Sequence, residues 1–69
     1  MRISVKKGNI WLSKDYVAIN LNLTQNIRIQ PAGNKWRLCF VADRDGGYFE
    51  YYTEEGAQEA FEKVMAIQL

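Results

Sequence analysis

The chain has 69 residues, a formal net charge of +1, one cysteine and no histidine. A chain this short forms one domain with a thin margin of stability, so we expect a single domain over residues 1–69. One cysteine excludes an intramolecular disulfide, and the lack of a Cys/His cluster excludes a structural zinc. Because both supports are absent, the sequence favours self-association as a homodimer, with an efficiently packed monomer as the alternative.

The N-terminal stretch has no apolar run of signal-peptide length, and no window of the sequence approaches a membrane span. We therefore expect no membrane partner. The unpaired Cys39 fits a reducing compartment, where thiols are not oxidised to disulfides. These features together predict a cytoplasmic protein.

Charge is distributed unevenly along the chain. The residues up to Arg37 carry seven basic side chains and one acid, whereas those from Leu38 onward carry two basic side chains and seven acids. One interpretation is a soluble, mildly self-complementary surface made of basic strands and an acidic helix. The other is a basic binding face on a sheet, with the acids segregated onto the helix.

The first half of the chain has the period of strands. Residues 2–6 alternate between polar and apolar side chains, which is typical of a half-buried strand. A turn at 7–9 and a short apolar run at 10–12 follow, and residues 16–23 alternate again. This pattern predicts either one hairpin or one long bent strand.

The second half continues as a meander. A short strand at 27–30 is followed by the strongest turn signal, at 31–34, where proline fixes φ and Gly-Asn accepts positive φ. Residues 35–42 form the clearest strand pattern, and the sequence at 43–47 suits a tight hairpin tip. A last strand is expected at 48–52.

The end of the chain predicts an amphipathic helix. Thr53 is a natural N-cap, and Glu54 and Glu55 place negative charge beside the positive end of the helix dipole. Apolar residues then recur at the spacing of one helical stripe, at Ala57, Ala60, Phe61, Val64 and Met65. A helix of this length is marginal alone, so its stripe must pack on the preceding strands.

These elements predict an α+β fold, an antiparallel meander of four to five strands packed on one face by a single C-terminal amphipathic helix. The expected core is Ile3, Val5, Val17, Ile19, Leu21, Ile27, Ile29, Trp36, Leu38, Phe40, Phe49, Ala57, Ala60, Phe61, Val64 and Met65. Phe61 lies in the middle of the helical stripe, so we expect its truncation to alanine to be the costliest, at about 3–5 kcal/mol.

Residues for catalysis are scarce. Without histidine the chain lacks the commonest general base and metal ligand. Cys39 inside a strand is typical of a packing residue rather than a nucleophile. Asp43, Asp45 and Glu50 could in principle hold a divalent cation, although a solvated hairpin tip is the favoured interpretation. We expect no enzyme activity, no cofactor and no metal.

Residues for binding are better represented. The sheet face away from the helix is expected to present basic and aromatic side chains, and five of them make up the predicted binding face: Tyr16, Arg28, Arg37, Tyr48 and Tyr52. Single-stranded nucleic acid stacks its bases on such rings while cations track its phosphates. Tyrosine and arginine are also enriched at protein interfaces. The third interpretation is a plain solvated face, because strands are rich in tyrosine and exposed strands carry lysine and arginine that prevent edge pairing.

The stretches YVAINLNLTQNIRI and KWRLCFVADRDGGYFEYYTEEGAQEAFEKV resemble small phage and bacterial proteins of unassigned function, in which a strand meander is closed by one C-terminal helix. Such proteins are similar to half of a pleckstrin-homology-like sheet. The resemblance implies no catalytic residue, and it implies an accessory or anti-defence role through binding a host protein. In order of elements, the chain also resembles coactivators that bind single-stranded DNA as dimers.

The sequence thus predicts a non-enzymatic binding module that acts through protein contacts on its open sheet face or on an edge strand. The alternative is a single-stranded nucleic-acid-binding protein that uses Tyr16, Tyr48, Tyr52, Arg28 and Arg37.

Overall fold

The computed structural model describes residues 1–44 and 46–67, and these form strands followed by one helix. In chain order the elements are β1 (Arg2–Lys6), β2 (Asn9–Lys14), β3 (Val17–Asn20), the 3-10 helix η1 (Leu21–Leu23), β4 (Asn26–Ala32), β5 (Lys35–Val41), β6 (Gly47–Tyr51) and α1 (Glu54–Met65). The predicted α+β class and the C-terminal helix are confirmed.

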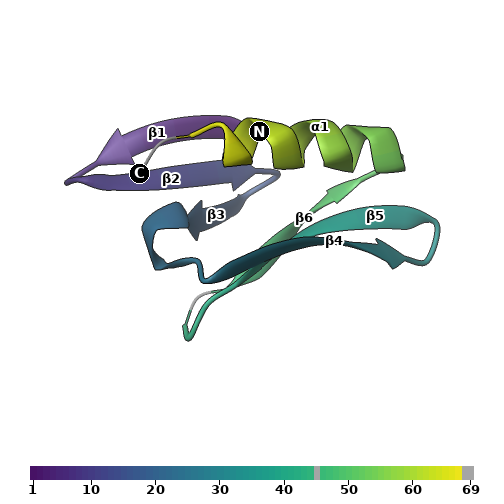
Figure 1. The fold of residues 1–69 in the computed structure, drawn as a ribbon, viewed down its shortest axis with the longest axis horizontal. Helices are drawn as coiled ribbons and strands as arrows, with labels where there is room; N and C mark the ends of the chain where they lie inside the picture. The colour runs from purple at the N-terminus through teal and green to yellow at the C-terminus, as the bar shows by residue number, and fades with distance from the viewer. Residues whose placement is uncertain (45, 68–69) are drawn as a thin grey trace.

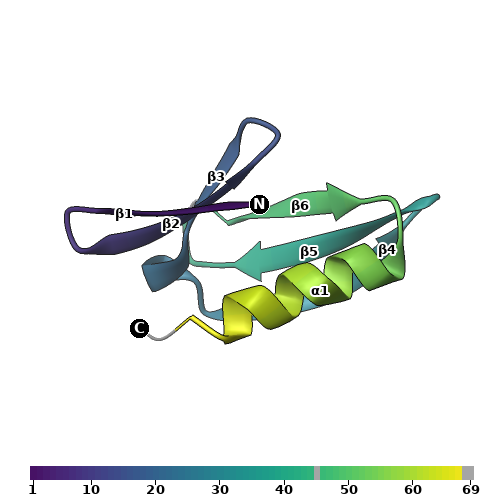
Figure 2. The same cartoon turned by 90° about the horizontal axis from the view of Figure 1, so that it is seen from above.

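The strands form two antiparallel sheets of three rather than one meander of four to five strands. We call β1-β2-β3 the N-terminal sheet and β4-β5-β6 the C-terminal sheet (Figures 1 and 2). The break falls at η1, where the Asn20 side chain accepts a hydrogen bond from the Asn22 N–H and the Thr24 N–H donates to the Leu21 carbonyl. These local bonds end the alternation that the sequence carries through residue 23.

The turns differ from the predicted ones in their bounds. Pro31 and Ala32 continue β4, so that only Gly33 and Asn34 form the turn to β5. The run at residues 10–12 belongs to a hairpin of β2 and β3, which was one of the two predicted alternatives. Its turn consists of Asp15 and Tyr16, both at positive φ.

Helix α1 covers one face of the C-terminal sheet (Figures 1 and 2). Thr53 caps it as predicted, because its hydroxyl oxygen accepts a hydrogen bond from the Gly56 N–H at 3.0 Å. Three stripe residues, Ala57, Ala60 and Val64, are buried. The stripe therefore packs where the 3.6-residue period places it.

The core lies between α1, the C-terminal sheet and the inner face of the N-terminal sheet. Its largest fully buried side chains are Leu12, Leu38, Phe40 and Phe49. The two phenylalanine rings pack edge to face with their centroids 5.2 Å apart. Leu12 was absent from the predicted core, because a short apolar run does not reveal which of its residues points inward.

Four residues predicted for the core are exposed. Ile3 and Val5 are 47% and 69% exposed, and Val17 and Met65 also face solvent. Ile3 is directly opposite the buried Leu12 in the sheet, so the predicted strand face is right. However, the β1–β2 hairpin projects beyond the end of α1 (Figures 1 and 2), and the helix does not cover it.

Candidate binding surface

The face of the C-terminal sheet that points away from α1 carries polar and aromatic side chains. Residues directly opposite each other in neighbouring strands share a face, so Arg28, Cys39 and Tyr48 form one cross-strand row. We call this surface the open face, and it is formed by Arg28, Gln30, Lys35, Arg37, Cys39, Tyr48, Glu50 and Tyr52.

Arg37 lies at the centre of the open face between a carboxylate and an aromatic ring. Its Nε donates to Glu50 Oε2 at 3.3 Å, and its guanidinium carbon lies 4.1 Å from the centroid of the Tyr48 ring. Both contacts cross between β5 and β6. They hold the Arg37 and Tyr48 side chains in place while Tyr48 stays 42% exposed.

A second pair of the same kind lies at the end of the sheet near the start of α1. The Lys35 Nζ lies 5.4 Å from the centroid of the Tyr52 ring, and Tyr52 is 84% exposed. With Arg28, the open face then has three cations against the single carboxylate of Glu50. Of the five residues predicted for binding, this surface brings together Arg28, Arg37, Tyr48 and Tyr52.

Tyr16, the fifth predicted residue, is not on the open face. It is fully exposed at the tip of the β2–β3 turn, with φ at 69°. The adjacent Asp15 lines a hollow beside β6 together with Lys14, Tyr48 and Glu50. The turn thus lies next to the edge of the open face, although it belongs to the N-terminal sheet.

Lys14 holds this turn against β6, a role that no sequence pattern indicates. Its Nζ donates to the Glu50 carbonyl at 2.8 Å and to Asp15 Oδ2 at 2.6 Å, and it lies 4.8 Å from the centroid of the Tyr51 ring. The hydrogen bond and charge of Lys14 lower the pKa of the Asp15 carboxyl below its usual value. The hydrogen bond to Glu50 joins residues 36 positions apart, a separation that no local sequence pattern reports.

Cys39 lies half-buried in the middle of the open face. Its Sγ is 3.8 Å from the side-chain oxygen of Gln30, with Arg28 and Tyr48 in the flanking row positions. An amide oxygen cannot take up a proton as a general base does. The surroundings of Cys39 are therefore those of a strand residue that packs among its neighbours.

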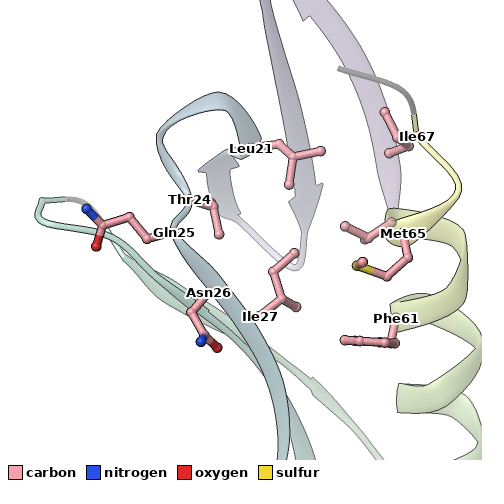
Figure 3. A pocket seen from close by; sticks show the side chains of 9 residues that line it. Leu21, Thr24, Gln25, Asn26, Ile27, Phe61, Met65 and Ile67 are labelled. Atoms are coloured by element: carbon pink, nitrogen blue, oxygen red, sulfur yellow. The ribbon is translucent and has the colours of Figure 1, made fainter.

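A hollow of about 340 Å³ lies between η1, the start of β4 and the last turns of α1 (Figure 3). Ile27 extends from one side towards Phe61 and Met65 on the other, whereas Gln25 and Asn26 point away from the helix. All of its lining side chains are uncharged. The hollow offers apolar contact but no acid or base.

Among the described residues, no three histidine, cysteine, aspartate or glutamate side chains lie close enough together to hold a metal ion. Asp45, one of the carboxylates considered for a cation, lies outside the described residues. In the same part of the chain, no helix is long and apolar enough to cross a bilayer, which takes about 20 apolar residues.

A scan against protein-family models found no match, and searches among curated proteins and among solved structures found no similar protein either. The resemblance to small phage and bacterial proteins therefore stays a prediction. What bears on function here is the geometry of the open face.

Proposed function

We propose that this protein is a non-enzymatic binding module whose open face engages a partner protein. The observation that carries the proposal is the pair of cation–tyrosine contacts, Arg37 with Tyr48 and Lys35 with Tyr52, set side by side on an exposed sheet. Tyrosine and arginine supply much of the binding energy at protein interfaces. Such a surface would also suit the role that the resemblance implies, which is an accessory or anti-defence role through binding a host protein.

Pre-ordering of the open face supports this proposal. Long side chains lose rotamer freedom on binding, at a cost of about 0.5–1.5 kcal/mol each. Arg37 is already restrained by Glu50 and by the Tyr48 ring, so part of that cost is met within the free protein. A surface with restrained arginine and tyrosine side chains is suited to binding without rearrangement.

The charges of the open face define the partner further. Three cations and one carboxylate favour a surface that is acidic overall but offers at least one donor to Glu50. Two copies meeting through this face would bring like charges together, so the face favours a different protein over a symmetric dimer. The homodimer expected from the sequence stays a prediction, to be checked by light scattering across a range of concentrations.

The test compares an open-face variant with a helix variant. Tyr48→Ser with Tyr52→Ser removes the exposed rings, whereas Gln58→Ser with Glu62→Ser changes exposed positions on α1. The parent protein and the two variants serve as separate baits for affinity capture from lysate of the source cells. Captured proteins are measured by quantitative mass spectrometry, and the purified partner is then titrated against each bait. We expect capture by the parent and the helix variant, and a loss of about tenfold or more for the open-face variant. Equal capture by all three would contradict the proposal.

A second candidate function is binding of single-stranded nucleic acid on the same face, and the exposed Tyr52 ring beside Lys35 favours it. Glu50 opposes it, because its carboxylate repels a phosphodiester backbone and already pairs with Arg37, one of the cations that phosphates would need. Titration with labelled oligonucleotides at low and high salt separates the two functions, since binding to phosphates weakens as salt rises. Lack of binding at low salt removes this candidate.

A further inference from the structure

β1 is the outer strand of the N-terminal sheet and pairs only with β2 among the described residues. Its inner-face side chains, Ile3 and Val5, are large and apolar, yet they are 47% and 69% exposed. Arg2 and Lys6 alternate with them on the opposite face. β1 therefore has two chemically distinct sides and one unpaired edge.

The turn that follows β1 determines which backbone groups lie on that edge. Only Lys7 and Gly8, both at positive φ, separate Lys6 from Asn9, so Lys6 and Asn9 are a hydrogen-bonded pair. Hydrogen-bonded and non-hydrogen-bonded pairs alternate along an antiparallel ladder. The N–H and C=O groups of Ile3 and Val5 consequently point away from β2, where another strand could pair with them.

Each of the other outer strands is obstructed at one or more positions. Pro31 in β4 has no N–H, and proline is a usual means of blocking a sheet edge. On β6, Lys14 Nζ already donates to the Glu50 carbonyl. The edge of β3 lies against β6. Within the described residues, β1 has no such cover.

The charges on β1 determine which strand can add. In an antiparallel pair of two β1 strands centred on Ser4, Arg2 of each copy would lie opposite Lys6 of the other. Like charges directly opposite each other destabilise a strand pair, and opposite charges stabilise it. Within residues 1–44 and 46–67, the strands cannot supply the missing acids, because their only acidic residue is Glu50.

We propose that the free edge of β1 accepts an extended segment of another protein, which adds antiparallel as a fourth strand of the N-terminal sheet. Residues of this segment opposite Arg2 and Lys6 are acidic, and those opposite Ile3 and Val5 are aliphatic. Backbone hydrogen bonds to Ile3 and Val5 provide affinity, and the alternating side chains provide selectivity. This surface is separate from the open face and does not depend on its function.

The probe is a short synthetic peptide that alternates glutamate and valine, with a peptide of the same composition in shuffled order as its control. Titrations of the full chain are followed by fluorescence anisotropy and by amide hydrogen exchange. We expect the alternating peptide to bind more tightly than the shuffled one and to slow exchange of the Ile3 and Val5 amides. Equal binding of both peptides, or no binding, would overturn the proposal.

Variants locate the binding on β1. Arg2→Glu with Lys6→Glu should weaken binding about tenfold and confer binding of a lysine–valine peptide, whereas Lys35→Glu on the open face should have little effect. Val5→Pro removes an outward N–H and should also abolish binding. Arg2 and Lys6 are both exposed, so their charge variant decides the matter even if Val5→Pro does not fold. Equal weakening by Lys35→Glu would refute the assignment to β1.

Discussion

Phe49 and Phe61 are the same residue type in different surroundings, and burial separates their expected contributions to stability. Phe49 is 2% exposed and packs edge to face on Phe40, whereas Phe61 is only half-buried and borders the hollow at the end of α1. Removing a buried ring costs its transfer free energy plus a cavity term. The costliest truncation is therefore expected in the buried pair of Phe40 and Phe49 rather than at Phe61.

We predict that Phe49→Ala lowers the free energy of unfolding by about 3–5 kcal/mol and that Phe61→Ala lowers it by clearly less. Urea denaturation of the two variants and the parent protein measures the difference. If the two substitutions cost the same, the packing of α1 described above is wrong.

Tyr51 is unusual at the residue scale because its hydroxyl is buried without a hydrogen-bond partner among the described residues. Burial raises the pKa of this phenol above its ordinary value of 10.0, and the charge of Asp15 adds to the effect. The folded state therefore holds the proton more tightly than the unfolded state. The associated stability is complete below pH 10 and is lost as the pH rises through the higher folded-state pKa.

We predict that Tyr51→Phe leaves stability at neutral pH unchanged or raises it by up to about 1 kcal/mol, because an unsatisfied polar group is removed. Above about pH 10, the parent should lose stability more steeply than the variant. Denaturant titrations at neutral and alkaline pH measure both effects. A marked loss of stability in Tyr51→Phe at neutral pH would show that the hydroxyl has a partner.

At the scale of single elements, the β2–β3 turn combines strain with exposure. Tyr16 adopts a left-handed conformation at φ 69°, which costs a non-glycine residue about 1–2 kcal/mol, and its ring contributes nothing to the core.

We predict that Tyr16→Gly leaves the free energy of unfolding unchanged or raises it by up to about 1 kcal/mol. Ala18→Gly, in the extended strand that follows, should instead cost about 0.5–1 kcal/mol. Thermal unfolding distinguishes them, and a loss for Tyr16→Gly as large as that for Ala18→Gly would argue against strain.

How well an element could be predicted depended on where its determinants lie. The cap at Thr53 and the stripe of α1 are encoded within one segment, so sequence periodicity located them. β5 was found for the same reason. The end of β3 depends on hydrogen bonds of Asn20 and Leu21 that compete with alternation, and the apolar pattern continues through them. The exposure of Ile3 depends on how far α1 extends over the strands, and the sequence of β1 does not encode the extent of α1.

The same distinction applies to the candidate site. Strand alternation placed Arg28, Arg37 and Tyr48 on one face, and the register confirms that placement. Alternation could not place Tyr16, because the turn that carries it breaks the period. The contact of Lys14 with β6 depends on how the two sheets meet, and the pattern of residues along one strand carries no signal for that arrangement.

At the scale of the whole molecule, the two sheets meet closely at Gly47 in β6. A Cβ at this position would lie 2.8 Å from Ile19 Cδ1 in β3, and Ile19 is buried with little room to move. We predict that Gly47→Ala costs about 1–3 kcal/mol by overpacking this junction. Ile19→Val removes the obstructing methyl group and should cost about 0.5–1.5 kcal/mol alone.

The double variant tests whether these two residues interact. Because Ile19→Val makes room for the new Cβ, the combined cost should be less than the sum by about 0.5 kcal/mol or more. Urea denaturation of the parent, both single variants and the double variant completes the cycle. Simple additivity would mean that Gly47 is required for its backbone rather than for the close approach of the sheets.

The division into two sheets also has a consequence for how the chain folds. Each strand pairing in the described residues joins strands that are consecutive in the sequence, so no hairpin must wait for a distant segment. Local pairings cost little loop-closure entropy, which favours fast folding for a protein so rich in strands. We expect the contacts that join the two sheets, those of Lys14 with Glu50 and of Ile19 with Gly47, to form after the hairpins, because they close over longer stretches of chain.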